Sequence, residues 1–163
     1  MDKEKERALL ILKKKFNFNM SEFSDRVMLQ KTTYLLKELN FPGLTKYKSY
    51  SWYIYGPYCS DLAHDAFTLY TKKDIKDVID NLELNLTEEN IINKYKTLCK
   101  KLKISEGLPK YASLELFASI IYFNKNKFNS EETFKKIKEY KPHLAYETLY
   151  KDAEDILKTE KLI

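Results

Sequence analysis

Apolar residues recur along most of the chain at intervals of three and four, the spacing of one face of an α-helix. Only three glycines and four prolines interrupt the chain, which favours long helices. The periodicity predicts helices over residues 3–16 and 74–79. It also predicts three helices that begin at a capping residue: one from Ser21 or Ser24 to Leu39, one from Ser60 or Asp61 to Tyr70, and one from Thr87 to Leu98. Three further helices are expected to begin near Ser113, at Ser130 and near Ala145.

Alternation of apolar and polar residues is confined to two short segments. Tyr50, Trp52 and Ile54 alternate with their neighbours and predict a strand whose Tyr50–Trp52–Ile54 face packs on the core. Gly56-Pro57 is expected to end this strand and turn the chain into the next helix, because proline cannot extend a strand ladder. Residues 82–86 alternate in the same way and predict a second short strand. A small β element is therefore expected beside the helices.

The whole chain, residues 1–163, is predicted to form one compact domain. Hydrophobic residues make up 44% and charged residues 33%, a globular balance, and there is no repeat or low-complexity linker. The charged segment 100–110 indicates a connection, since the parts on either side are too short to fold alone. The expected fold class is mainly α with a small β element, and a winged-helix-like arrangement is one form of it.

Several patterns bear on where the protein acts. No apolar run approaches the roughly 20 residues that cross a bilayer, and the charged N-terminus lacks the apolar segment of a signal peptide. A cytoplasmic location without membrane binding is therefore expected, with Cys59 and Cys99 as free thiols.

Net charge leaves the choice of partner open. The chain carries +5, but of its 29 basic residues only Arg7 and Arg26 are arginine. Arginine offers the flat fork of donors that suits phosphates and base edges, whereas runs of lysine usually form a solvated face.

Catalytic patterns are weak. His64 follows Cys59 by five residues, which places the two about 140° apart around a helix, and His143 has no companion for a metal. The chain has no glycine-rich phosphate loop and no nucleophile-elbow motif. We therefore expect no enzyme activity, no cofactor and no metal.

Three segments carry a resemblance to a known family. They are Leu29-Gln30-Lys31-Thr32-Thr33-Tyr34-Leu35-Leu36-Lys37-Glu38-Leu39, Tyr53-Ile54-Tyr55-Gly56-Pro57-Tyr58-Cys59-Ser60-Asp61-Leu62, and Ser113-Leu114-Glu115-Leu116-Phe117-Ala118-Ser119-Ile120, with Lys141-Pro142 near the end. In order and spacing they resemble the YwgA-like family, and the resemblance covers nearly the whole chain. Cys59 departs from the pattern, since serine is commoner after Tyr-Gly-Pro-Tyr.

The resemblance extends to the Panacea or SocA-like antitoxin domain and to the C-terminal domain of macrodomain antitoxins. Those domains act by binding a protein. The resemblance therefore implies a non-enzymatic protein-interaction module of the toxin–antitoxin or host–virus conflict type, with a toxin, a protease or a defence component as partner. Residues 72–104 match no pattern of the family.

The aromatic segment around Gly56-Pro57 and the helix after it are the expected binding surface. Tyrosines supply rigid contact area and polar tips, which suits either a protein interface or a core corner that only orients the helix. The expected partner-binding residues are Tyr53, Tyr55, Gly56, Pro57, Tyr58, Asp61, His64 and Asp65, with Gln30 and Lys31. For Gln30 and Lys31 two interpretations compete: contacts to a partner or to the tyrosine-rich corner, and an ordinary solvated face.

Nucleic-acid binding is the alternative function. Basic residues interleaved with aromatics can hold phosphates and stack bases. In this hypothesis, a helix-turn-helix-like unit around residues 26–39 reads bases, with Gln30 and Lys31 as its only suitable side chains.

Overall fold

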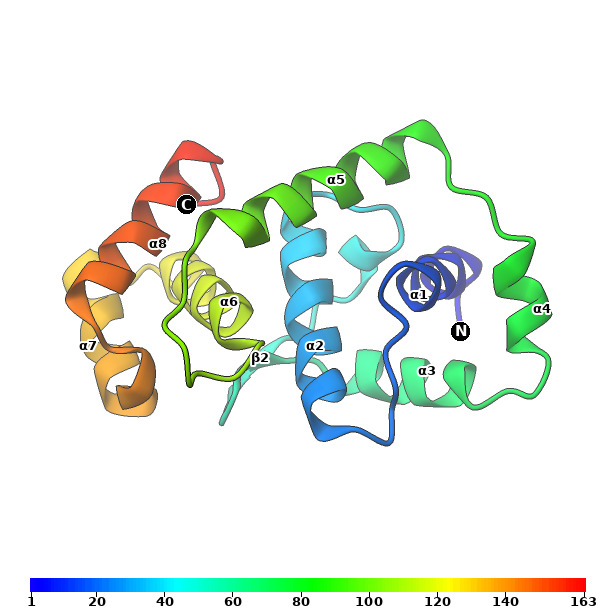
Figure 1. Ribbon diagram of the computed structural model, residues 1–163, viewed down its shortest axis with the longest axis horizontal. Helices are drawn as coiled ribbons and strands as arrows, with labels where there is room; N and C mark the ends of the chain where they lie inside the picture. The colour runs from blue at the N-terminus through cyan, green and yellow to red at the C-terminus, as the bar shows by residue number, and fades with distance from the viewer.

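Helices dominate the structure, a computed structural model that describes residues 1–163 (Figure 1). The elements are α1 (Lys3–Phe16), α2 (Phe23–Glu38), the 3-10 turn η1 (Leu44–Lys46), β1 (Ser51–Tyr53), β2 (Gly56–Tyr58), α3 (Ser60–Tyr70), α4 (Ile75–Asp80), α5 (Leu86–Lys101), α6 (Ala112–Lys125), α7 (Ser130–Tyr140), the 3-10 turn η2 (Pro142–Leu144) and α8 (Glu147–Thr159). The predicted fold class, mainly α with a small β element, is confirmed.

Helix α2 lies at the centre of the fold. In Figure 1 it separates α1, α3 and α4 from α6, α7 and α8, while α5 crosses above it, and α2 contacts α3, α5, α6 and β2. Nine of its sixteen residues are buried, including the polar pair Gln30 and Lys31. A helix surrounded in this way buries several faces instead of the single stripe of a surface helix.

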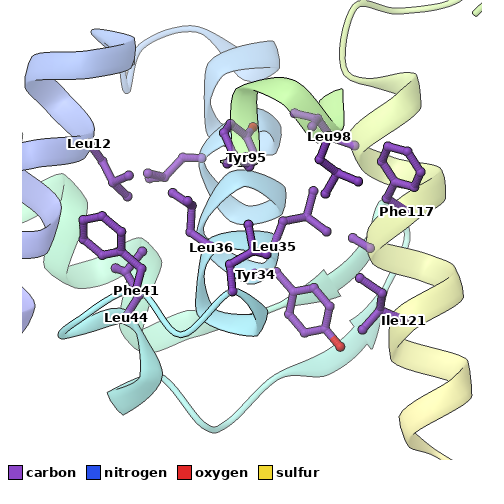
Figure 2. Packing of buried hydrophobic residues seen from close by; sticks show 14 of the residues in the cluster. Leu12, Tyr34, Leu35, Leu36, Phe41, Leu44, Tyr95, Leu98, Phe117 and Ile121 are labelled. Carbon is purple, nitrogen blue, oxygen red and sulfur yellow. The ribbon is translucent and has the colours of Figure 1, made fainter. Parts of the chain in front are cut away.

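One continuous hydrophobic core runs through the molecule. It joins 35 buried residues from the first helix to the last. Figure 2 shows side chains of several elements meeting around α2, among them Leu12, Leu35, Leu36, Tyr95, Leu98, Phe117 and Ile121. Burial of this apolar surface is the main source of stability, at about 25 cal/mol for each Å² removed from water.

The predicted helix caps were wrong. Helix α2 begins after Glu22 and α3 after Cys59, and neither residue makes a side-chain capping bond. Helix α5 begins after Asn85 instead of Thr87, because Asn85 and Glu88 form a reciprocal capping box. This cap also explains why the predicted strand over residues 82–86 is absent: its last residues already start α5.

The predicted strand is half of a hairpin. Strands β1 and β2 pair antiparallel, with Trp52 opposite Pro57 and Tyr53 opposite Gly56. The prediction that Gly56-Pro57 ends the β element was wrong, because both residues lie inside β2. Gly56 adopts a φ of +95°, which glycine tolerates and other residues avoid.

The apolar face predicted for the first strand is only partly correct. Trp52 is partly buried and packs with its ring 4.5 Å from that of Phe123 in α6. Ile54, in contrast, is 68% exposed, because the chain turns at this residue instead of continuing as a strand. The expectation that Ile54 packs on the core was therefore wrong.

Candidate functional site

Gln30 ties the hairpin to the central helix. Its side chain is only 4% exposed. The amide Nε2 donates to the Cys59 carbonyl, and Oε1 accepts from the Cys59 N–H, both at 3.0 Å. One side chain therefore pairs with both backbone groups of the residue that precedes α3.

Two buried lysines donate hydrogen bonds to backbone carbonyls of the hairpin. Lys31 Nζ donates to the Pro57 carbonyl at 2.8 Å. Lys141 Nζ donates to the Ile54 carbonyl at 2.9 Å and to Glu115 Oε1 at 2.5 Å. Because all three ionisable side chains are at most 2% exposed, water contributes little to them, and these contacts fix the position of the hairpin.

The charges of this buried group do not balance. Two amines face one carboxylate, and Glu115 Oε2 has no hydrogen-bond partner, with His143 Nε2 3.7 Å away. Burial, together with the nearby charge of Lys141, lowers the pKa of Lys31 to about 7, against the opposing effect of Glu115. Burial also lowers the pKa of Lys141, again against Glu115. Near neutral pH the group therefore relieves its excess charge by releasing a proton from Lys31.

The interpretation of Gln30 and Lys31 as a solvated face was wrong. Both side chains are buried by β2 and its flanking residues, and their contacts to the tyrosine-rich corner are confirmed. The periodicity of α2 alone did not reveal this, because it marks one apolar stripe and the helix is covered on several sides. Neither side chain is exposed for the base contacts of the nucleic-acid hypothesis.

An apolar pocket opens between α2, the hairpin and α3. Its volume is about 320 Å³, and nine of its thirteen lining residues are hydrophobic. The walls include Phe23, Val27, Tyr53, Tyr55, Tyr58 and Phe67. Concave, mostly apolar sites with a few polar groups are typical of binding sites in proteins.

Exposed aromatic side chains surround this pocket. Phe23, Tyr53 and Phe67 line it and remain 46%, 57% and 59% exposed, respectively. The rings also pack against one another. Phe23 packs edge-on against Tyr55 with their ring centroids 5.1 Å apart, and the ring centroids of Tyr53 and Tyr58 are 5.5 Å apart. Single exposed apolar residues are ordinary on protein surfaces, whereas clusters of them are typical of interaction sites.

The structure brings together part of the predicted site. Six of the ten predicted residues line the pocket: Gln30, Lys31, Tyr53, Tyr55, Gly56 and Tyr58. Pro57 is buried, and its carbonyl serves as the acceptor for Lys31.

The predicted polar rim lies outside the pocket. Asp61 and His64 are exposed on α3 without lining it. Asp65 is occupied inside the chain, because it accepts a hydrogen bond from the Tyr47 hydroxyl at 2.9 Å.

Sequence reasoning missed other lining residues, above all Phe23, Arg26 and Phe67. Phe67 carried a usable signal, because it is a large apolar residue off the buried stripe of its helix, which runs through Leu62, Ala66 and Leu69.

Cys59 and His64, the pair considered for catalysis, differ in their exposure to solvent. The Cys59 thiol is buried, and burial raises its pKa, whereas His64 is exposed. Both cysteines are free, as predicted. No group of three or more His, Cys, Asp or Glu side chains is placed to hold a metal ion. None of the helices combines the length and apolar character of a membrane span.

Comparison with known proteins gives no match: no protein-family model, curated protein or solved structure is significantly similar to this chain.

Proposed function

We propose that this chain is a non-enzymatic protein-binding module, with the apolar pocket and its aromatic rim as the binding surface. The observation that carries the proposal is the gathering of Phe23, Tyr53 and Phe67, all exposed, around one cavity. Large apolar and aromatic side chains that enter such a pocket contribute most of the binding energy of many protein interfaces.

The rigidity of the hairpin supports the same proposal. Gln30, Lys31 and Lys141 bind backbone groups of the hairpin and of Cys59. The tyrosines on the hairpin are therefore held in place before a partner arrives. A preorganised surface loses less conformational entropy on binding, which leaves more of the contact energy as affinity.

The class of partner rests on the resemblance to the YwgA-like, Panacea and macrodomain-antitoxin domains. We propose accordingly that the partner is a toxin, a protease or a defence component in the cytoplasm, which the module masks or delivers. The nucleic-acid alternative is not proposed, because its two base-reading side chains are buried beneath the hairpin.

Affinity purification from the native host, with the neighbouring gene products included, tests the proposal. Phe67→Asp places a charge on the pocket rim. The control Leu86→Asp places a charge outside the pocket, at an apolar residue of α5 that is 73% exposed. We expect Phe67→Asp to lose the partner and Leu86→Asp to retain it at wild-type yield. Equal capture by both variants, each with an unchanged melting temperature, would contradict the proposal.

A further inference from the structure

The wall of the pocket contains a buried amine with unused hydrogen-bonding capacity. Lys31 lines the cavity, and its only hydrogen-bond acceptor is the Pro57 carbonyl. A protonated lysine amine has three N–H donors. Two donors therefore remain without an acceptor in a side chain that is only 2% exposed.

Gly56 lies against this amine. A Cβ atom placed on Gly56 would lie 3.6 Å from Lys31 Nζ and 3.2 Å from Ser119 Oγ. The absence of a side chain at Gly56 therefore lets strand β2 approach Lys31 and Ser119 closely. Gly56 also lines the pocket, so the amine lies next to a residue of the cavity wall.

The charge near the amine calls for an anion. Lys31 and Lys141 face Glu115 as the single buried carboxylate of the group. A ligand carboxylate beside Lys31 would balance the charge, because two amines would then face two carboxylates. Since buried charges are stable only when paired and hydrogen-bonded, an anion with an apolar body fits both the amine and the pocket.

We propose that the pocket binds a small monocarboxylic acid, with its apolar body between Phe23, Tyr55 and Phe67 and its carboxylate accepting hydrogen bonds from Lys31. A volume of about 320 Å³ lies at the lower end of the range for ligand pockets, roughly 300–1,000 Å³, which favours a small acid. This ligand site goes beyond protein binding and would make occupation of the pocket responsive to a metabolite.

Binding of the acid is coupled to uptake of a proton. The charged and titratable groups around Lys31 are Lys141 after α7, Glu115 of α6 with His143 beside it, Arg26 at the pocket rim, and the phenols of Tyr55 and Tyr58 on the hairpin. Burial lowers the pKa of Lys31 to about 7, and a bound carboxylate raises it again. Above about pH 7 the affinity therefore falls by up to about tenfold per pH unit.

The test is titration calorimetry with 3-phenylpropionate and, as a matched neutral probe, 3-phenylpropanamide. At about pH 6, where both the acid and Lys31 are charged, we expect the acid to bind at least about tenfold more tightly than the amide. Lys31→Met should abolish this preference. Lys94→Met, at an exposed lysine of α5, should leave it unchanged.

The proposal would be overturned by no binding of the acid at millimolar concentration, by equal affinity for acid and amide, or by an affinity that does not fall between about pH 7 and pH 9. Tighter binding of N-acetylglycylphenylalanine than of the small acid would overturn it in favour of a chain terminus. If Lys31→Met does not fold, the amide and pH comparisons on the wild-type chain decide. None of these results depends on a protein partner, so the two proposals fail separately.

Discussion

The anchoring of the hairpin by Gln30 leads to a quantitative prediction. The variant Gln30→Leu keeps the approximate size of the side chain but removes both hydrogen bonds to Cys59. The Cys59 carbonyl retains one partner, because the Ala63 N–H donates to it at 3.2 Å. The Cys59 N–H loses its partner and remains buried.

The expected loss of stability follows from this accounting. A buried donor left without a partner costs about 1–3 kcal/mol, and the bonded carbonyl adds little. We therefore expect the free energy of unfolding to fall by about 2 kcal/mol. For a chain of this size that corresponds to a decrease in melting temperature of about 4–8 °C.

Urea denaturation followed by circular dichroism measures the effect. Asn93→Leu, an amide-to-leucine change at an exposed position of α5, is the matched control and should stay within about 0.5 kcal/mol of wild type. If Gln30→Leu also stays within that range, Gln30 does not anchor the hairpin and the reasoning is refuted.

Three further predictions concern the same framework. Gly56→Ala should destabilise the fold more than Gly107→Ala, since the two glycines have nearly equal φ values of +95° and +94° but only Gly56 has close neighbours; thermal melting of both variants compares them, and equal losses would refute the close approach. The pKa of Lys31 is lowered from 10.5 to about 7 on folding, so the buried charge destabilises the fold fully below pH 7 and less as the pH rises toward 10. Wild type should therefore gain stability relative to Lys31→Met between about pH 7 and pH 9, by at most about 1.4 kcal/mol per pH unit. Parallel profiles of urea stability against pH for the two proteins would count against this. Arg7→Ala should lower stability by about 1–3 kcal/mol, because Glu88 loses two hydrogen bonds of 2.8 Å to the guanidinium; an unchanged urea midpoint would show that the pair is unimportant.

Local patterns in the sequence predicted the helices but not the residues that cap their N-termini. Periodicity located α1 and α3 because each presents an apolar stripe to the core. The caps were less predictable, since several Ser, Thr, Asn or Asp residues stand within one turn of each start. At α5 the reciprocal bonds between Asn85 and Glu88 place the cap at Asn85, two residues before the predicted Thr87.

The candidate site was predictable only in part, because it depends on contacts between distant segments. The tyrosines near Gly56 stand out in the sequence as a cluster. The partner of Gln30 is 29 residues away and that of Lys141 is 87 residues away, and no local pattern links them. The burial of Lys31 follows from the same long-range packing, which is why its polar surroundings suggested a solvated face.

Site-specific photocrosslinking tests most directly whether the pocket is the partner-binding surface. The photoreactive amino acid p-benzoylphenylalanine would replace either Phe67 on the pocket rim or Leu86 on α5, both of which are exposed. Irradiation of host cells should give a discrete crosslink to one protein from position 67 and none from position 86, and an excess of unlabelled wild-type chain should suppress it. A crosslink from position 86 with none from position 67 would contradict the account.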